Sequence, residues 1–233
     1  MSIDKESNFV NTKCVYDITK FTHLDYPNQL ACIIWFSGCN MRCEYCYNKD
    51  IVFANSANYS VSDALEFLKS RIGLLDAVVL SGGEATNHDL VELCKEIKNL
   101  GYKIKLDTNG TNFKNLQTLC ELNLIDYIAL DYKAPPSKYK DITKSSKFNE
   151  FSISLQYLIL SDIDFEVRTT LHADLLNEDD INEIIKDLDS RGYKNSYYIQ
   201  EFMETENNIG NIESPINSFD RSKLLDSLDV VFR

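Results

Sequence analysis

The chain has 233 residues, 44% of them hydrophobic and 26% charged, which is ordinary for a globular protein that folds without disulfides. Its formal net charge is −12, from 24 Lys and Arg against 36 Asp and Glu. An acidic surface repels phosphate groups, so we expect no nucleic-acid partner and no membrane partner. The sequence has no apolar run of about 18 residues and starts with a polar segment, so we expect a cytoplasmic protein.

Short apolar runs alternate with amphipathic segments along most of the chain. The predicted strands are Leu30–Phe36, Ala77–Leu80, Lys103–Asp107, Tyr127–Asp131, Phe165–Leu171 and Tyr197–Phe202. The predicted helices are Ser60–Gly73, Asp89–Leu100, Glu178–Arg191 and the less regular segments 112–123 and 219–229. This alternation predicts an α/β fold with one parallel sheet or barrel.

Repeats and linkers are absent from the sequence, which favours a single domain over residues 1–233. We expect a flexible start over 1–15 and a C-terminal extension over 204–233. The Lys-rich, polar stretch 134–150 is interpreted as a solvated loop that could flank a cavity.

Polar residues gather where the predicted strands end. They are 39–46, 81–84, 107–110, 131–133, Arg168, Gln200 and Glu201. In parallel α/β folds the carboxyl ends of the strands share one edge, and ligands bind there. We therefore expect one cavity at this edge.

Three of the seven cysteines, Cys39, Cys43 and Cys46, form a C-x3-C-x2-C motif. A structural zinc site needs four ligands, and no fourth Cys or His follows at a suitable spacing. Three thiolates on an iron–sulfur cubane leave one iron open to a small molecule. A non-catalytic zinc or iron–sulfur module remains an alternative. Three further cysteines are interpreted as small buried hydrophobes: Cys32, Cys94 and Cys120.

This motif, with Tyr45 before its last cysteine, resembles the radical S-adenosylmethionine superfamily. The segments LSGGEAT, LDTNGT, YIALDYKAP and VRTTLH follow in that family's order. Together they resemble the activating enzymes of glycyl-radical proteins, in particular the anaerobic ribonucleoside-triphosphate reductase activating proteins. The resemblance implies a partial (β/α)6 barrel of mostly parallel strands.

The same resemblance implies a [4Fe–4S] cluster on Cys39, Cys43 and Cys46, with S-adenosylmethionine on the open iron. The reduced cluster would cleave S-adenosylmethionine, and the resulting radical would take a hydrogen atom from a glycine of a partner protein. The implied partner is an anaerobic ribonucleotide reductase, and flavodoxin or ferredoxin would donate the electron. The alternative is a radical enzyme acting on a small molecule, such as a 7-carboxy-7-deazaguanine synthase.

Family resemblance also implies roles for four residues near the cofactor. Gly82 and Gly83 would let the backbone approach the methionine end, where a Cβ would clash. Glu84 would accept a hydrogen bond from the amino group, and Tyr45 would lie against the adenine. The alternative for the glycines is a plain turn between a strand and a helix.

Two aspartates resemble positions that hold a monovalent cation beside the cofactor carboxylate. These are Asp107 and Asp131, and Thr108 and the Ala129 carbonyl would complete the site. Clustered carboxylates need a cation or a proton, which supports this role. Alternatively, Asp107 caps the turn that follows it.

Two cations, Lys133 and Arg168, are expected to neutralise the cofactor carboxylate or to fix an incoming peptide. Arg168 lies inside an apolar predicted strand and therefore needs a buried partner. Tyr47 stands where relatives often have His, which leaves the role of that position open. His172 is interpreted as a loop residue rather than a ligand.

Overall fold

A computed structural model describes residues 11–233 of the chain, so residues 1–10 of the expected flexible start lie outside the described part. The described residues form two compact units. The first unit holds 11–40, 50–108 and 114–128, and the second holds 41–49, 109–113 and 129–233. The single domain expected over 1–233 stays a prediction.

The strands of the first unit pair in the order β3-β1-β2-β4-β5. Their bounds are β1 Lys13–Thr22, β2 Ala31–Phe36, β3 Tyr59–Ser60, β4 Ala77–Gly82 and β5 Lys103–Thr108. β2, β4 and β5 are parallel, whereas β1 runs antiparallel to both β2 and β3. β1 was not predicted, and its first residues belong to the expected flexible start. Val15 in it is fully buried, so this part of the chain is ordered by packing.

Apolar side chains fix the central strands of the first unit. Val78, Val79 and Leu80 in β4 are fully buried, as expected for a parallel strand covered on both faces. One core cluster brings Ala31 and Ile33 of β2 against Ala77 and Val79 of β4. The alignment of these strands sets where their carboxyl ends lie.

Helices follow the strands of the first unit, as predicted. They are α3 Val61–Lys69, α4 Val91–Asn99 and the 3-10 turn η1 Ala85–Asn87, while α2 Lys49–Val52 and α5 Phe113–Glu121 start at the unit borders. Ser60 caps α3, and its hydroxyl and the Asp63 carboxylate form a capping box. This cap confirms the start read from the sequence.

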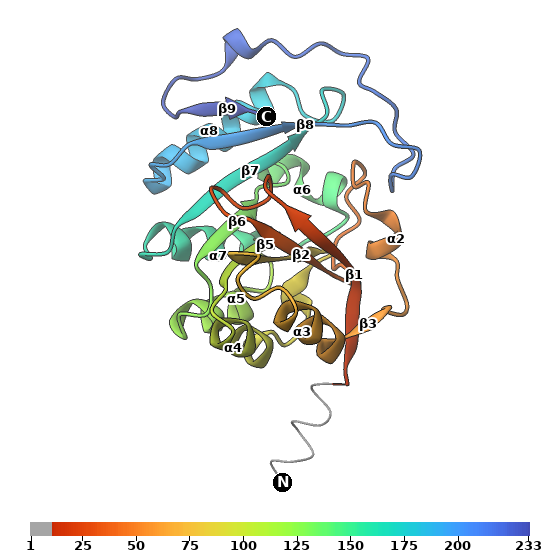
Figure 1. Cartoon of the computed structure of the whole chain (residues 1–233). Coiled ribbons are helices and arrows are strands. Elements are labelled where there is room, and N and C mark those ends of the chain that lie inside the picture. The colour runs from red at the N-terminus through yellow and green to blue at the C-terminus, as the bar shows by residue number, and fades with distance from the viewer. Residues whose placement is uncertain (1–10) are drawn as a thin grey trace. The chain divides into compact units, whose positions relative to one another are not determined.

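The strands of the second unit are the end of β6 (Tyr127–Asp131), β7 (Phe165–Leu171), β8 (Tyr197–Glu201) and β9 (Val230–Phe232). β7, β8 and β9 are parallel neighbours (Figure 1). Residues 202–229, here called the excursion, form a long connection between β8 and β9 (Figure 1). Helices of this unit are α6 Pro136–Thr143, α7 Phe148–Ile159 and α8 Glu178–Arg191. The bounds of β6, β7 and α8 are those predicted.

Two predictions in this unit were wrong. The stretch 134–150 is not a loop, because it forms α6 and the start of α7, and Tyr139 and Ile142 of α6 are buried. The segment 219–229 is not an α-helix either. It contains only the 3-10 turn η2 Arg221–Lys223, whose basic side chains pair with Glu201 and Glu178.

Parallel strands with intervening helices confirm the α/β class with mostly parallel strands. In residues 11–233, none of the helices has the length and apolar character required to cross a membrane.

Candidate functional site

The cysteine loop, residues 37–48, connects β2 to α2, and its first residues belong to the first unit. Gly38 has a positive φ of 80°, which favours glycine, and its N–H donates to the Ile51 carbonyl at 2.8 Å. Before it, the Ser37 N–H donates to the Cys14 carbonyl at 3.0 Å. These bonds fix the backbone that leads into Cys39, whose side chain is partly exposed.

A glycine pair at the end of β4 is attached to the same backbone. The Gly83 N–H donates to the Phe36 carbonyl and the Glu84 N–H to the Gly38 carbonyl, both at 2.9 Å. A Cβ on Gly82 would lie 2.3 Å from the Phe36 nitrogen, and one on Gly83 would lie 2.0 Å from the Gly38 oxygen. The clash that excludes other residues is therefore with the chain's own backbone. Both glycines hold Glu84 beside the residue that precedes Cys39.

Glu84 is 2% exposed and its carboxylate is held by short hydrogen bonds. Its Oε1 accepts from the Thr86 N–H at 3.1 Å and from the Thr86 hydroxyl at 2.6 Å. The Thr108 hydroxyl donates to the same oxygen at 2.8 Å. Thr108, expected as a cation ligand, therefore orients Glu84 in this structure.

Asp107 contacts a buried cation that sequence reasoning missed. The Lys105 ammonium lies 2.7 Å from Asp107 Oδ1, and the Ser81 hydroxyl donates to Oδ2 at 3.1 Å. Lys105 is 2% exposed in the middle of β5. The signal was present in the sequence, since a lysine inside an apolar strand needs a partner just as Arg168 does.

Cys43 and Cys46 lie in the second unit on a loop with fixed backbone. The Cys46 N–H donates to the Cys43 carbonyl at 3.1 Å, which closes a turn between the two thiols. The end of α6 contacts this loop, because the Arg42 N–H donates to the Thr143 carbonyl at 2.9 Å. Cys43 is buried and Cys46 is partly exposed.

Tyr45, between these cysteines, is almost fully buried. Its hydroxyl donates to the Lys133 carbonyl at 3.2 Å, and burial raises its pKa well above the usual value. Tyr47 next to the loop is 51% exposed. The role of Tyr45 against an adenine stays a prediction.

Asp131, Lys133 and Arg168 form a partly buried charge cluster at the ends of β6 and β7. The Lys133 ammonium lies 2.9 Å from Asp131 Oδ2, and the Arg168 Nε–H donates to Asp131 Oδ1. Asp131 is thus the partner that Arg168 requires. Burial by itself raises the pKa of Asp131, but the two cations outweigh it and hold this pKa far below the usual value.

This charge cluster carries one negative and two positive groups, a net charge of about +1 at neutral pH. Burial lowers the pKa of Lys133, but Asp131 and then the Cys43 sulfur raise it above its ordinary value. Burial likewise raises the pKa of the Cys46 thiol, and the Lys133 ammonium partly offsets this. The Lys133 ammonium is therefore close enough to Cys43 and Cys46 to act electrostatically on both sulfurs.

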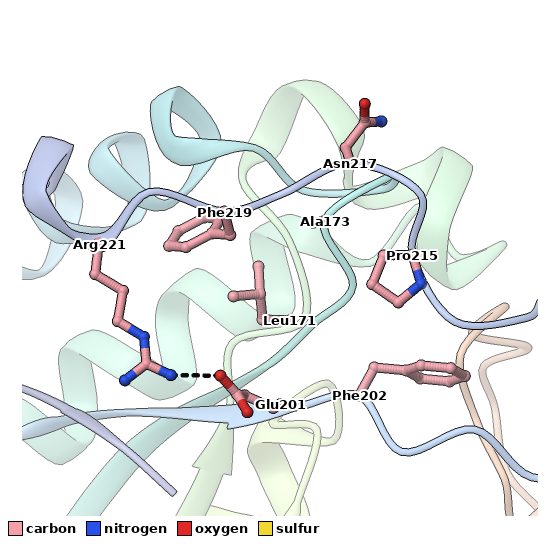
Figure 2. A pocket seen from close by; sticks show the side chains of 8 residues that line it. All are labelled: Leu171, Ala173, Glu201, Phe202, Pro215, Asn217, Phe219 and Arg221. Carbon is pink, nitrogen blue, oxygen red and sulfur yellow. Dashed lines mark hydrogen bonds and ion pairs between the residues drawn. The ribbon is translucent and has the colours of Figure 1, made fainter.

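The structure also places Glu201 and His172 at the ends of β8 and β7. A pocket of about 310 Å³ opens there, lined by Leu171, Ala173, Glu201, Phe202, Pro215, Asn217, Phe219 and Arg221. Figure 2 shows the ion pair of Arg221 with Glu201 beside the apolar side chains. His172 is buried, with Nε2 at 2.8 Å from the Glu213 carbonyl oxygen.

The donor chemistry of the cysteine loop fits an iron–sulfur cluster. None of the seven cysteines, all within the described residues, forms a disulfide. Over residues 11–233 no group of three or more His, Cys, Asp or Glu is gathered for a single metal ion. In a cubane each thiolate binds a different iron, so the three sulfurs need not converge on one point.

The interpretation of Cys32, Cys94 and Cys120 as small buried groups is confirmed. Cys32, Cys94 and Cys120 are buried, and burial raises the pKa of each thiol to about 12. Cys14 is buried in β1, and burial raises its pKa to about 11. Such thiols are poor metal ligands and poor nucleophiles, which leaves the loop as the candidate site.

Three curated relatives are similar in sequence. A protein of Methanocaldococcus jannaschii named "Putative glycyl-radical enzyme activating enzyme" is 32% identical over 81% of this chain and 79% of its own length. A pyruvate formate-lyase-activating enzyme of Clostridium pasteurianum is 30% identical over 59% of this chain and 60% of its own length. A 7-carboxy-7-deazaguanine synthase of Clostridium acetobutylicum is 31% identical over 52% of this chain and 54% of its own length.

Solved structures share the fold. Streptococcus suis SuiB bound to S-adenosylmethionine matches 86% of this chain with a TM-score of 0.67 and 14% identity. The chain spans about half of that protein, since the match covers 49% of it. This likeness shows that the two proteins share a fold.

A family model, that of the Radical SAM superfamily, matches residues 33–194. The match includes most of β2, the cysteine loop, the glycine pair and the charge cluster. Because it covers more than half of the sequence, the chain belongs to the radical S-adenosylmethionine superfamily.

Proposed function

We propose that this radical S-adenosylmethionine enzyme generates a glycyl radical on a partner enzyme, with an anaerobic ribonucleotide reductase as the expected partner. Membership of the superfamily implies a [4Fe–4S] cluster and S-adenosylmethionine. The relatives named as activating enzymes support the partner class. The observation that carries the proposal is the C-x3-C-x2-C loop. Its backbone is hydrogen-bonded at Gly38, before Cys39, and at Arg42, before Cys43.

Cys39, Cys43 and Cys46 are proposed to hold the cluster. When bound, the cluster supplies one electron that cleaves S-adenosylmethionine to methionine and a carbon radical, which then removes a hydrogen atom from a glycine α-carbon. Flavodoxin or ferredoxin is the expected source of that electron. Glycine suits this reaction because it has no side chain to block the approach.

Glu84 is proposed to accept a hydrogen bond from the amino group of S-adenosylmethionine. Its orientation is already set by Thr86 and Thr108, so little conformational freedom is lost when the cofactor binds. Gly82 and Gly83 act through this same carboxylate, since they fix the backbone that carries it. Tyr45 is proposed to contact the adenine.

Lys133 and Arg168 are proposed to balance negative charge brought by the cluster thiolates and the cofactor carboxylate. Asp131 holds both cations in place, and the three groups together carry a net positive charge. A monovalent cation at Asp107, Thr108 and Asp131 is supported less well. Lys105 already pairs with Asp107, and Lys133 and Arg168 already pair with Asp131.

The test is electron paramagnetic resonance of candidate partners after strictly anaerobic incubation with the reconstituted enzyme, S-adenosylmethionine and a reductant. We expect a doublet on the partner that disappears when its target glycine becomes alanine. Turnover of S-adenosylmethionine without a radical on any candidate glycyl-radical enzyme would overturn the proposal.

A small-molecule substrate is the second candidate, and the similarity to 7-carboxy-7-deazaguanine synthase favours it. In that case 5′-deoxyadenosine would form only when the small molecule is added. Mass spectrometry of the products would separate the two functions, because the activase transfers no atom from a free small substrate.

A further inference from the structure

The excursion after β8 reaches back to the cysteine loop. The Ile209 N–H donates to the Cys46 carbonyl at 3.0 Å, and the Gly210 N–H donates to the Glu44 carbonyl at 2.8 Å. Both acceptors flank Tyr45. The segment Thr205–Ile212, here called the clamp, therefore contacts the turn that carries the last two cysteines.

The end of α6 holds the same loop through other backbone groups. The Glu44 N–H donates to the Ile142 carbonyl at 3.2 Å, while the Glu44 carbonyl accepts from the clamp. The Lys144 ammonium also pairs with the Glu44 carboxylate at 2.5 Å. Glu44 is thus fixed between α6 and the clamp.

Position 210 requires glycine because a side chain there has no room beside Glu44, and not because of its backbone angles. Its φ is outside the positive range, so another residue could adopt its backbone angles. A Cβ on it would lie 2.9 Å from both the Cβ and the carbonyl oxygen of Glu44. Any side chain at this position must push the clamp and the cysteine loop apart.

Asn208 gives the clamp its shape. It is 3% exposed, and its Oδ1 accepts from the Ile212 N–H at 2.8 Å. Its Nδ2 donates to the Ile212 carbonyl at 2.7 Å and to the Thr205 carbonyl at 3.2 Å. These three bonds close the turn that presents Ile209 and Gly210 to the loop.

We propose that the clamp positions Cys43 and Cys46 for the cluster, with Asn208 and Gly210 as positioning residues. The inference rests on the proposed function, because it concerns the same cluster. A cubane held by three thiolates lacks a fourth protein anchor, so movement of the loop releases iron more easily. No residue of 204–233 had a role assigned from the sequence.

The experiment measures iron release from the anaerobically reconstituted full chain into excess chelator, together with the electron paramagnetic resonance spectrum of the reduced cluster. We expect Gly210→Ala and Asn208→Ala to release iron at least about threefold faster and to broaden the spectrum. Asn208→Asp keeps the acceptor but places a carboxylate oxygen against the Ile212 and Thr205 carbonyls, so release at least as fast as in Asn208→Ala is expected. Ile216→Ala is the matched control, since Ile216 lies in the same excursion and is 94% exposed.

The thermal midpoint of each cluster-free variant separates a local effect on the loop from a general loss of folding, which would lower this midpoint. Release rates equal to wild type in Gly210→Ala and both Asn208 variants would overturn the clamp and leave the proposed function intact. Failure of the wild type to hold a four-iron cluster would overturn both. If Gly210→Ala does not fold, the two Asn208 variants decide the question.

Discussion

Glu84 and Asp131 are carboxylates in very different surroundings. The Glu84 oxygen accepts hydrogen bonds from an amide and two hydroxyls, which are neutral donors. Asp131 is paired with Lys133 and Arg168. A carboxylate held by neutral donors keeps its charge for an incoming cationic group, whereas a carboxylate between two cations serves to place them. The two residues therefore give different predictions.

Glu84→Gln is expected to weaken S-adenosylmethionine binding about tenfold or more, because a hydrogen bond to a charged group contributes roughly 1.5–3 kcal/mol. Iron content should stay at the wild-type level, since Glu84 is not a proposed ligand of the cluster. Anaerobic calorimetry on the reconstituted protein measures the affinity. Glu92→Gln, on the exposed face of α4, is the matched control. Equal affinity in wild type and Glu84→Gln would remove Glu84 from the site.

Asp131→Asn is expected to lower the free energy of unfolding by about 2 kcal/mol at pH 7, because two partly buried cations lose their partner. The folded pKa of Asp131 is depressed, so its contribution is complete above the unfolded pKa of about 4 and is lost as the pH falls toward the folded value. Wild type should therefore lose stability more steeply than the variant below about pH 4. Urea unfolding of the cluster-free protein at several pH values measures this. Parallel curves for the two proteins would show that the carboxylate does not pair in solution.

Helix α6 is formed by a polar stretch of the chain, and its end supports the cysteine loop. Only Tyr139, Ile142 and Thr143 of it are buried, yet its last carbonyls receive the backbone of the cysteine loop. Helix C-terminal carbonyls lack partners within the helix and need outside donors. The N–H groups of Arg42 and Glu44 supply such donors.

Lys140→Pro is expected to cost about 3 kcal/mol of stability, since proline inside a helix removes a hydrogen bond and clashes with the preceding turn. The substitution should also speed iron release, because the loop loses its support. Lys140→Ala keeps the helix at an exposed position and should behave as wild type. Chemical denaturation together with iron release checks both effects. A Lys140→Pro variant as stable as wild type would show that residues 136–143 do not form a helix in solution.

Elements with strong local signals were predictable from the sequence. β6 is a nearly continuous apolar run, β7 begins with apolar residues that alternate with charged ones, and α8 has a regular apolar stripe with a capping box at Asn177. β1 was missed because its buried and exposed residues do not form such a run. α6 was missed because its few apolar residues stand among lysines.

The candidate site was predictable to the same degree. The cysteines are close in sequence, and Glu84 follows a glycine pair, so both could be read directly. The clamp could not, because its contacts with Glu44 and Cys46 are made by backbone groups more than 150 residues away in the chain. Backbone hydrogen bonds between distant segments leave no residue-type signature. The requirement for glycine at position 210 becomes apparent only when Glu44 is seen to lie against it.

The family match ends at residue 194, before β8, the clamp and β9. The turn that carries Cys43 and Cys46 nevertheless contacts this last part of the chain through Ile209 and Gly210. The backbone support of Cys46 thus comes in part from residues outside the segment that the family model matches.

Cys43→Ala in the full chain is expected to hold markedly less iron after anaerobic reconstitution, because the cubane loses one of three protein ligands. Cys94→Ala is the control, since Cys94 is buried in α4. Iron and sulfide analysis measures the difference. Equal iron content in Cys43→Ala and wild type would place the metal elsewhere.

Three thiolates are proposed to hold a four-iron cluster with one iron open to S-adenosylmethionine. Mössbauer spectroscopy of the ⁵⁷Fe-reconstituted chain, recorded with and without S-adenosylmethionine, tests this arrangement. We expect about four irons per chain and a changed signal from one of them when the cofactor is added. Stoichiometric zinc in place of iron, or four iron signals that do not respond to S-adenosylmethionine, would contradict it.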